Sequence, residues 1–296
     1  MITVIGGVEI SIKVKTLVPE KGEGKKEGTV NEIKTVCGGG GFNIAGNLAA
    51  SGQEAALISA VGKDILGRAA LEELKEAGVD TRGVAVLSGV TPVKTEILNI
   101  LGDAEFTGED KGLLQRITPE VIDAGRELIA ASDIVVIDGK IPADSIRYAA
   151  ELCEKEEGKR IFFDPGSVEG SGRAAELTGS FHGVMPGRME AEAMTGGSIL
   201  SEDQLMEAGS LLTGRGVSKI IITMKGGGLY YKEGMTEGIL RPERVLSFAD
   251  TSGAGDVVSA AVAEGAALGL DIEETAKRAM KRAADFLAAL EDKKPI

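Results

Sequence analysis

One stretch of the chain indicates its fold and chemistry more strongly than any other: Asp250-Thr251-Ser252-Gly253-Ala254-Gly255-Asp256, which continues into Val257-Val258-Ser259-Ala260-Ala261-Val262-Ala263. At Val257 the glycines and small polar residues give way to an apolar, alanine-rich pattern that is typical of a buried helix. Backbone N–H groups in the first turn of a helix lack partners within the helix and lie at the positive end of its dipole. The stretch therefore predicts a site for an anion with the Asp256 carboxylate beside it.

These parts suit phosphoryl transfer. Gly253, Ala254 and Gly255 have no bulky side chains, so their amides can surround a phosphoryl group whose charge grows during transfer. Asp256 can take the proton of an attacking hydroxyl group. An Asp before a helix is also an ordinary N-cap, and Gly-Ala-Gly is an ordinary tight turn. Two Asp residues that bracket Thr-Ser-Gly-Ala-Gly before an alanine-rich helix favour the functional interpretation.

A second glycine-rich stretch, Gly38-Gly39-Gly40-Gly41-Phe42-Asn43, precedes a helical pattern over residues 44–50. Consecutive glycines can offer backbone N–H groups to a polar ligand, and the Asn43 amide offers a donor and an acceptor suited to vicinal hydroxyls. A flexible loop with an Asn cap explains the same residues equally well. The spacing does not match the dinucleotide fingerprint or the Gly-Lys-Ser/Thr phosphate loop.

Composition limits the partners and the location that we expect. The 296 residues carry a formal net charge of −13, so we expect neither nucleic acid nor an anionic membrane as partner. Cys37 and Cys153 are the only cysteines and form no C-x-x-C motif, which favours a reducing, cytoplasmic location. His182 is the only histidine, so catalysis must depend on carboxylates, lysines and the backbone.

Apolar runs alternate with helical patterns along most of the chain. Residues 55–61, 134–138, 161–164 and 219–224 read as buried strands, and patterns such as 65–77 and 119–131 read as helices. Repeated strand–helix units predict a parallel sheet covered on both faces. Ligands of such sheets bind where the strands end. The residues that fall at those ends are Asp138, Asp164, Met185 and Thr223.

Three other segments alternate apolar and polar residues, the period of half-exposed strands. They are residues 8–15, 29–36 and 93–101. We expect these strands to form a small sheet apart from the main body, with its segments spanning about 8–36 and 91–108.

The chain resembles the ribokinase-like (PfkB) family of carbohydrate and nucleoside kinases. The resemblance rests on residues 38–45, 250–256 and 59–64, and it spans almost the whole chain in the family's order. It implies one α/β domain over residues 1–296 with a three-layer fold: a mostly parallel central sheet with helices on both faces. The small sheet would be a lid that closes over the substrate and often forms a homodimer contact.

The resemblance also implies an ATP-dependent transfer of the γ-phosphoryl group to a hydroxyl of a sugar or nucleoside, with Mg²⁺. Asp256 would be the base, with Gly253, Ala254 and Gly255 as the anion hole, and Glu190 would act indirectly near Mg²⁺ and phosphate. The implied acceptor-binding residues are Ser11, Gly39, Asn43, Lys140 and Asp256, and the implied ATP-binding residues are Thr223, Lys225, Gly226, Gly228, Gly253 and Gly255.

Within the family, short matches such as Phe163-Asp164-Pro165 resemble pseudouridine kinase-like members, which slightly favours a nucleoside acceptor. Phe42 could form an apolar wall for a flat base, and core packing explains it equally well. Phe106 is the only other aromatic residue expected near the acceptor.

Several positions depart from the family's pattern. Ser11 stands where an Asp usually grips sugar hydroxyls, and Gly187 replaces the Asn of the Asn-x-x-Glu element. Lys225 stands where many members have Gly, and Lys140 lies near a place where sugar kinases often have an acidic group. The chain also ends soon after its last helix, so a monovalent-cation site is doubtful. The alternative hypothesis is therefore a catalytically weak or inactive protein that binds a nucleotide or sugar as a regulator.

Overall fold

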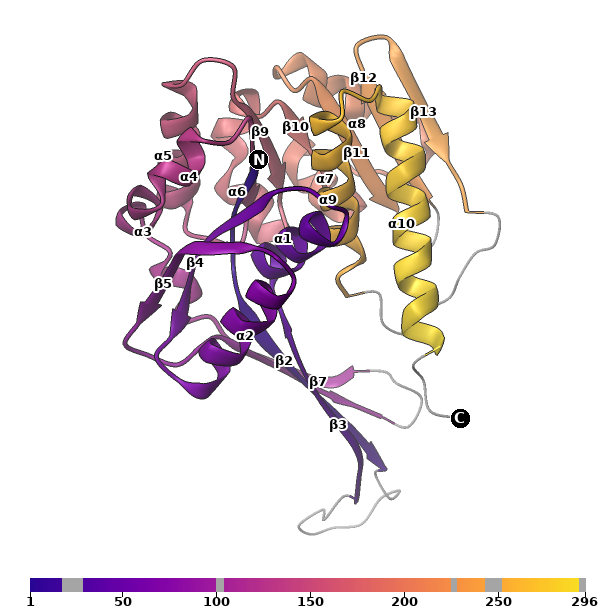
Figure 1. Ribbon diagram of the computed structural model, residues 1–296. Helices are drawn as coiled ribbons and strands as arrows, with labels where there is room; N and C mark the ends of the chain where they lie inside the picture. The colour runs from indigo at the N-terminus through magenta and orange to yellow at the C-terminus, as the bar shows by residue number, and fades with distance from the viewer. Residues whose placement is uncertain (18–28, 100–103, 225–227, 243–251, 293–296) are drawn as a thin grey trace.

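The computed structural model describes residues 1–17, 29–99, 104–224, 228–242 and 252–292. Within these ranges a sheet of nine strands forms the centre, in the order β13-β12-β11-β10-β9-β8-β1-β4-β5 (Figure 1). Neighbours from β5 to β11 are parallel, while β12 and β13 pair antiparallel at one edge. The strands are β1 (Ile2–Ile5), β4 (Ala55–Gly62), β5 (Asp80–Leu87), β8 (Ile134–Asp138), β9 (Arg160–Asp164), β10 (Gly183–Val184), β11 (Lys219–Met224), β12 (Gly228–Glu233) and β13 (Thr236–Leu240).

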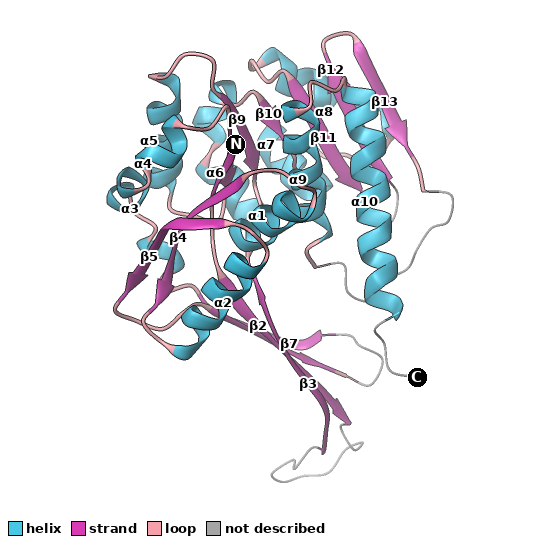
Figure 2. Ribbon diagram, in the orientation of Figure 1, coloured by secondary structure: helices cyan, strands magenta, loops and turns pink. Residues whose placement is uncertain are grey.

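Helices cover both faces of this sheet, and each face has its own apolar core. In β8, Val135 and Ile137 belong to one core and Ile134 and Val136 to the other, as the two-residue period of a strand requires. Four helices contribute to the core that contains Ile134 and Val136, and they lie on the near side of the sheet in Figure 2. They are α1 (Gly40–Ala50), α2 (Ile65–Glu76), α9 (Ala254–Ala267) and α10 (Ile272–Asp292). The opposite face carries α3 (Pro119–Ala124), α4 (Arg126–Ala130), α5 (Ala143–Glu154), α6 (Val168–Arg173), α7 (Arg188–Thr195) and α8 (Glu202–Gly214). The three-layer α/β prediction is confirmed.

A second sheet of four strands lies below the body in Figure 1, in the order β3-β2-β6-β7. Its strands are β2 (Glu9–Leu17), β3 (Thr29–Gly38), β6 (Val93–Leu98) and β7 (Ala104–Asp110). β2 follows β1 after Gly6-Gly7-Val8, and β3 leads through Gly39 into α1, so this sheet is connected to the body beside the start of α1. Alternation along β2 puts Glu9 and Ser11 on one face and Ile10 and Ile12 on the other.

Two local features differ from the sequence-based prediction. The helix predicted over residues 119–131 is divided at Gly125 into α3 and α4. A Cβ on Gly125 would lie 2.8 Å from Cδ1 of Ile58, so the division brings backbone close to the sheet. The antiparallel pair β12 and β13 was not anticipated.

Side chains cap the N-termini of two other helices. The Asp64 side chain caps α2 by accepting from the Gly67 N–H at 2.7 Å, and Ser201 caps α8 by accepting from the Gln204 N–H at 3.3 Å. Within the described residues, the helices are all too short or too polar to span a lipid bilayer.

Candidate active site

Two helix N-termini and several strand ends meet at one edge of the main sheet. Asp138 and Asp164 are the last residues of the neighbouring strands β8 and β9 and stand opposite one another in register. Helices α1 and α9, whose sequences are more than 200 positions apart, pack together beside them. At their junction, Nδ2 of Asn43 donates a hydrogen bond to Oδ2 of Asp256 at 2.6 Å. The two glycine-rich stretches of the sequence therefore join in one site.

Asp256, the base expected from the sequence, lies in the first turn of α9. Burial raises the pKa of its carboxyl group to about 6, while the Asn43 hydrogen bond and the positive charge of Lys140 act in the opposite direction. A carboxyl with this pKa is mostly ionised at pH 7 but holds a proton far more readily than an exposed Asp. These are the properties that a general base in this position needs.

The start of α9 has the form of an anion site. Gly253 precedes the helix with φ of 86°, in the left-handed region that favours glycine. A Cβ on Gly253 would lie 3.2 Å from Cζ of Phe286 in α10, whereas a Cβ on Gly255 would meet no described atom within 4 Å. Gly255 therefore faces open space beside the N–H groups of the helix, where a phosphoryl group can approach the backbone.

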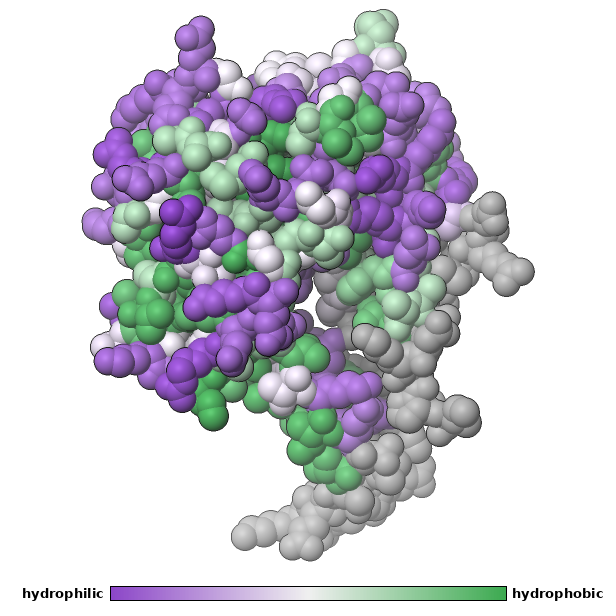
Figure 3. Space-filling model, viewed as in Figure 1, coloured by the Kyte–Doolittle hydropathy of each residue, from purple (hydrophilic) through white to green (hydrophobic). Residues whose placement is uncertain are grey.

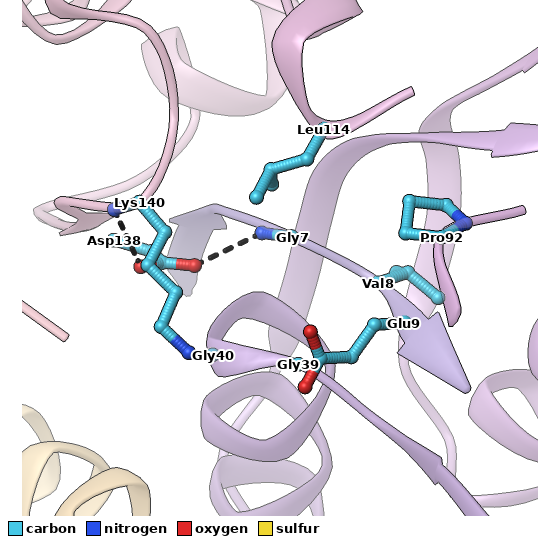
Figure 4. Close-up of a pocket in the computed structure, with 9 residues that line it drawn as sticks. All are labelled: Gly7, Val8, Glu9, Gly39, Gly40, Pro92, Leu114, Asp138 and Lys140. Atoms are coloured by element: carbon cyan, nitrogen blue, oxygen red, sulfur yellow. Dashed lines mark hydrogen bonds between the residues drawn. The ribbon is translucent and has the colours of Figure 1, made fainter. Parts of the chain in front are cut away.

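A pocket with about 210 Å³ of empty space, part of it open to solvent, lies next to this junction (Figure 4). Apolar side chains form one wall, glycine backbone forms another, and three ionisable side chains project from two elements of the fold. The lining residues are Gly7, Val8, Glu9, Gly39, Gly40, Pro92, Leu114, Asp138 and Lys140. The glycines are needed here because a Cβ on Gly40 would lie 2.7 Å from Oδ2 of Asp138.

Backbone groups hold Asp138 in place. Its Oδ2 accepts from the Gly7 N–H at 3.1 Å and its Oδ1 accepts from the Lys140 N–H at 3.0 Å, the two bonds drawn in Figure 4. Lys140 lies two residues after Asp138, in the loop between β8 and α5. Burial lowers the pKa of its ammonium group, but Asp138, Glu9 and Asp256 outweigh burial and raise that pKa above its ordinary value. Lys140 is therefore a permanent cation in a largely acidic pocket.

Asp164 connects the sheet to α9. Its Oδ2 accepts from Ser259 Oγ at 2.6 Å and its Oδ1 accepts from the Gly166 N–H at 3.0 Å. Burial, together with the negative charge of Asp256, raises the pKa of Asp164 well above its ordinary value, while the Ser259 bond opposes the rise. Ser259 lies one turn after Asp256 on α9, so this bond ties the start of the helix to β9.

Glu190 lies in the first turn of α7. Its Oε2 accepts from the backbone N–H of Gly187 at 2.6 Å. Burial raises the pKa of Glu190, and the Gly187 bond opposes that rise. Gly187 also bridges to Thr223 of β11, so the residue that replaces the expected Asn still connects Glu190 to the end of β11 through its backbone.

Comparison with known proteins decides the family. The model of the pfkB family of carbohydrate kinases matches residues 1–287. The chain belongs to this family. It is thus a phosphotransferase with an alcohol group as acceptor, and the predicted recognition and enzyme class are confirmed.

Individual relatives of this kinase differ in their acceptors. It is 26% identical over 233 residues to the pseudouridine kinase of Escherichia coli (strain K12), covering 78% of this chain and 74% of the relative. It is 27% identical over 294 residues to the guanosine-inosine kinase of Exiguobacterium acetylicum, covering 98% and 95%. Among solved structures, a carbohydrate kinase from Agrobacterium tumefaciens has a TM-score of 0.81 at 27% identity, covering 96% of this chain and 89% of the other.

The structure brings most of the expected acceptor residues of the kinase together. Gly39 and Lys140 line the pocket, and Asn43 and Asp256 form the adjoining pair. Ser11 is outside the lining and lies two residues along β2 from Glu9, on the same face.

The expected nucleotide residues are more widely spread. Thr223 lies beside Gly187 at the end of β11. Gly228 begins β12. A Cβ at this position would lie 1.9 Å from the carbonyl oxygen of Leu240 on β13, so the pairing of these strands is enough to explain a glycine here. Lys225 and Gly226 lie outside the described residues.

The aromatic wall suggested for a flat base is not found in this pocket. Phe42 is 8% exposed and packs in the core with Ile44 and Leu48, and none of the nine lining residues is aromatic. Phe106 is 57% exposed and pairs with Ile97 on the opposite face of the small sheet from Glu9. Of the two interpretations of Phe42, core packing is the correct one.

Sequence reasoning missed Glu9 as a site residue. The signal was present, because Glu9 and Ser11 share one face of an alternating strand that begins directly after β1. Ser11 replaces the Asp that usually binds sugar hydroxyls in the family. The Glu9 carboxylate, two positions earlier on the same face, was therefore a candidate to bind those hydroxyls.

Proposed function

We propose that this kinase transfers the γ-phosphoryl group of ATP, with Mg²⁺, to a hydroxyl of a small sugar or nucleoside. The observation that carries the proposal is the 2.6 Å bond from Asn43 to Asp256 at the N-terminus of α9, next to the acceptor pocket. A pseudouridine-like nucleoside is slightly favoured, since a pseudouridine kinase is among the relatives. A catalytically inactive binding protein is the less favoured alternative, because the base and its hydrogen-bond partner are in contact.

The chain's own residues account for the proton and the charge in this reaction. Asn43 donates to Oδ2 of Asp256 and orients the carboxylate, so Oδ1 can take the proton of the acceptor hydroxyl. The N–H groups at residues 253–255 then face the negative charge that develops during transfer. When bound with Mg²⁺, ATP supplies the phosphoryl group.

The donor groups present fit a magnesium–nucleotide complex. Among the described residues, no three or more His, Cys, Asp or Glu side chains are grouped so as to hold a metal ion by themselves. Mg²⁺ in kinases is usually held by one or two carboxylates together with phosphate oxygens and water. Glu190 is the carboxylate that we assign to this role, acting through water, near the start of α7.

The small sheet serves in this proposal as the lid of a single catalytic unit, residues 1–296, that works in the cytoplasm as a homodimer. Val14, Ile33, Ile97 and Phe106 form a continuous apolar row across its four strands, on the face away from Glu9. Ile33 and Phe106 are 62% and 57% exposed. A second copy of the lid would cover such a row. The free thiols of Cys37 and Cys153 are consistent with a reducing location.

The proposed function is tested by measuring ADP release from Mg²⁺-ATP with a panel of nucleosides and free sugars. Turnover that depends on one acceptor class, with the phosphorylated product identified by mass spectrometry, supports the kinase and names the acceptor. Acceptor-independent ADP release alone, from a folded protein that binds ATP, would favour the regulator instead.

A further inference from the structure

The charges around the acceptor pocket bear on its substrate class. Four carboxylates act on the single ammonium group of Lys140: Asp138, Glu9, Asp256 and Glu109. Glu9 and Asp138 line the pocket, and Asp256 adjoins it. Lys140 is the only basic residue in the lining. An acceptor that enters this space therefore meets an excess of negative charge.

The other lysine whose charge acts on Glu9, Lys94, is engaged in an ion pair. Lys94 on β6 stands in register with Ser11 and pairs with Glu96 at 3.0 Å. Glu96 also pairs with Lys13 at 3.6 Å, and Glu109 on β7 stands in register with Lys94, so two carboxylates lie beside these two lysines. Both lysines are engaged in ion pairs on the small sheet, and neither lines the pocket.

Glu9 is placed to receive hydroxyl groups. It begins β2, directly after the glycines that follow β1, and its carboxylate lies beside Gly39 in Figure 4. Burial raises the pKa of Glu9, and the charges of Glu109 and Asp138 add to that rise, while the ammonium groups of Lys140 and Lys94 oppose it. An ionised carboxylate has two oxygens that can accept from two neighbouring hydroxyls at once.

Resting on the proposed function, we infer that the pocket selects an uncharged acceptor with vicinal hydroxyls, held by Glu9, and excludes sugar phosphates. Glu9 takes the place of the carboxylate missing at Ser11, from two positions earlier on the same strand face. Lys140 neutralises part of the carboxylate cluster and is not a phosphate receptor. Repulsion between like charges is a strong means of excluding a wrong partner.

The first test measures acceptor binding by titration calorimetry with the wild-type protein and a non-hydrolysable ATP analogue. The probes are ribose, pseudouridine, inosine, their monophosphates and the 2′-deoxy form of inosine. We expect at least one uncharged member to bind, about 100-fold more tightly than its monophosphate. A monophosphate that binds as tightly as its parent or more tightly, or failure of all uncharged members to bind, overturns the inference.

The second test compares Glu9→Gln with Glu32→Gln. Glu32 lies on β3 of the same sheet and pairs with Lys34 at 3.0 Å, away from the pocket, so it is a matched control. Glu9→Gln should weaken binding of the vicinal diol about tenfold or more, weaken the deoxy analogue much less, and reduce discrimination against the monophosphate. Equal effects of Glu9→Gln on diol and deoxy probes overturn the inference.

Binding and turnover separate the two proposals. Selective binding of an uncharged diol without ADP release would contradict the kinase and leave the pocket inference standing. Turnover of a sugar phosphate by the wild-type protein, lost in Asp256→Asn, would support the kinase and contradict the pocket inference.

Discussion

The charge of Lys140 acts on Asp256, and it is one of the influences on the pH at which the proposed base would work. The pKa of Asp256 is about 6, raised by burial and held down by Asn43 and Lys140. Since the ionised carboxylate is the active form, kcat/KM should rise with pH through about 6 and level off above it.

Lys140→Met should move that acid limb to higher pH. Without the ammonium, one of the two main influences that lower the Asp256 pKa is lost. The measurement is kcat/KM from pH 5 to 8. The control is Lys159→Met, which removes a lysine that donates to the carbonyls of Ala130 and Ser132 and does not line the pocket. An acid limb in Lys140→Met at or below the wild-type position would contradict the assigned coupling.

The candidate base could be identified from sequence because its evidence is local. Residues 250–256 and 38–43 each contain the glycines and the polar side chain that the site needs. For Glu9 the sequence showed only that it shares a strand face with Ser11. Its place beside Lys140, which is far away in the sequence, depends on the fold. Phe42 was ambiguous for the same reason, because only packing shows that it lies in the core.

At the scale of elements, a buried ionic group holds together the three helices that position the base. Glu264 of α9 is 1% exposed and pairs with Arg278 at 2.7 Å and Arg282 at 2.5 Å, both from α10. Arg282 also donates to the carbonyl of Asn47 on α1 at 2.9 Å. Helices α1 and α9 carry Asn43 and Asp256, so this group fixes their relative position.

Glu264→Gln should lower the free energy of unfolding by about 3 kcal/mol, because it removes the shared partner of a buried ion pair. Urea unfolding measures this loss. Glu273→Gln is the matched control, since Glu273 makes an exposed pair with Lys277 on α10 that contributes about 0.5 kcal/mol or less. A loss for Glu264→Gln no larger than that of the control would show that the group does not hold the helices.

Most elements were predictable, because apolar periodicity and caps are local properties. Asp64 at the start of α2 and the buried run of β8 are examples. The beginning of α1 was not, since Gly40 and Gly41 are poor helix formers that become helical through close packing. A Cβ on Gly41 would lie 2.5 Å from the carbonyl carbon of Gly6, so the contact of α1 with the end of β1 decides the conformation.

At the scale of the whole molecule, the small sheet has two faces with different chemistry. The face with Glu9 and Ser11 is charged and faces the pocket, whereas the apolar row from Val14 to Phe106 lies on the other. Apolar side chains are visible on the small sheet in Figure 3. This division suits a lid that closes over an acceptor on one side and binds a second copy on the other.

Ile33→Glu should therefore convert a dimer to a monomer in sedimentation velocity experiments at micromolar concentration. A charge in the centre of an apolar interface is left buried and unpaired. Leu200→Glu, at a residue that is 80% exposed on the body, is the matched control and should leave the dimer intact. A wild-type protein that sediments as a monomer, or an Ile33→Glu dimer, would contradict the proposed interface.

The most direct test of the catalytic account is turnover by Asp256→Asn with the best acceptor of the panel. The amide keeps the size of the carboxylate but cannot take the hydroxyl proton, so kcat should fall by about 100- to 10,000-fold. Binding of Mg²⁺-ATP, measured on the same protein by calorimetry, should be retained. A variant that binds ATP and phosphorylates the acceptor at the wild-type rate would show that Asp256 is not the base.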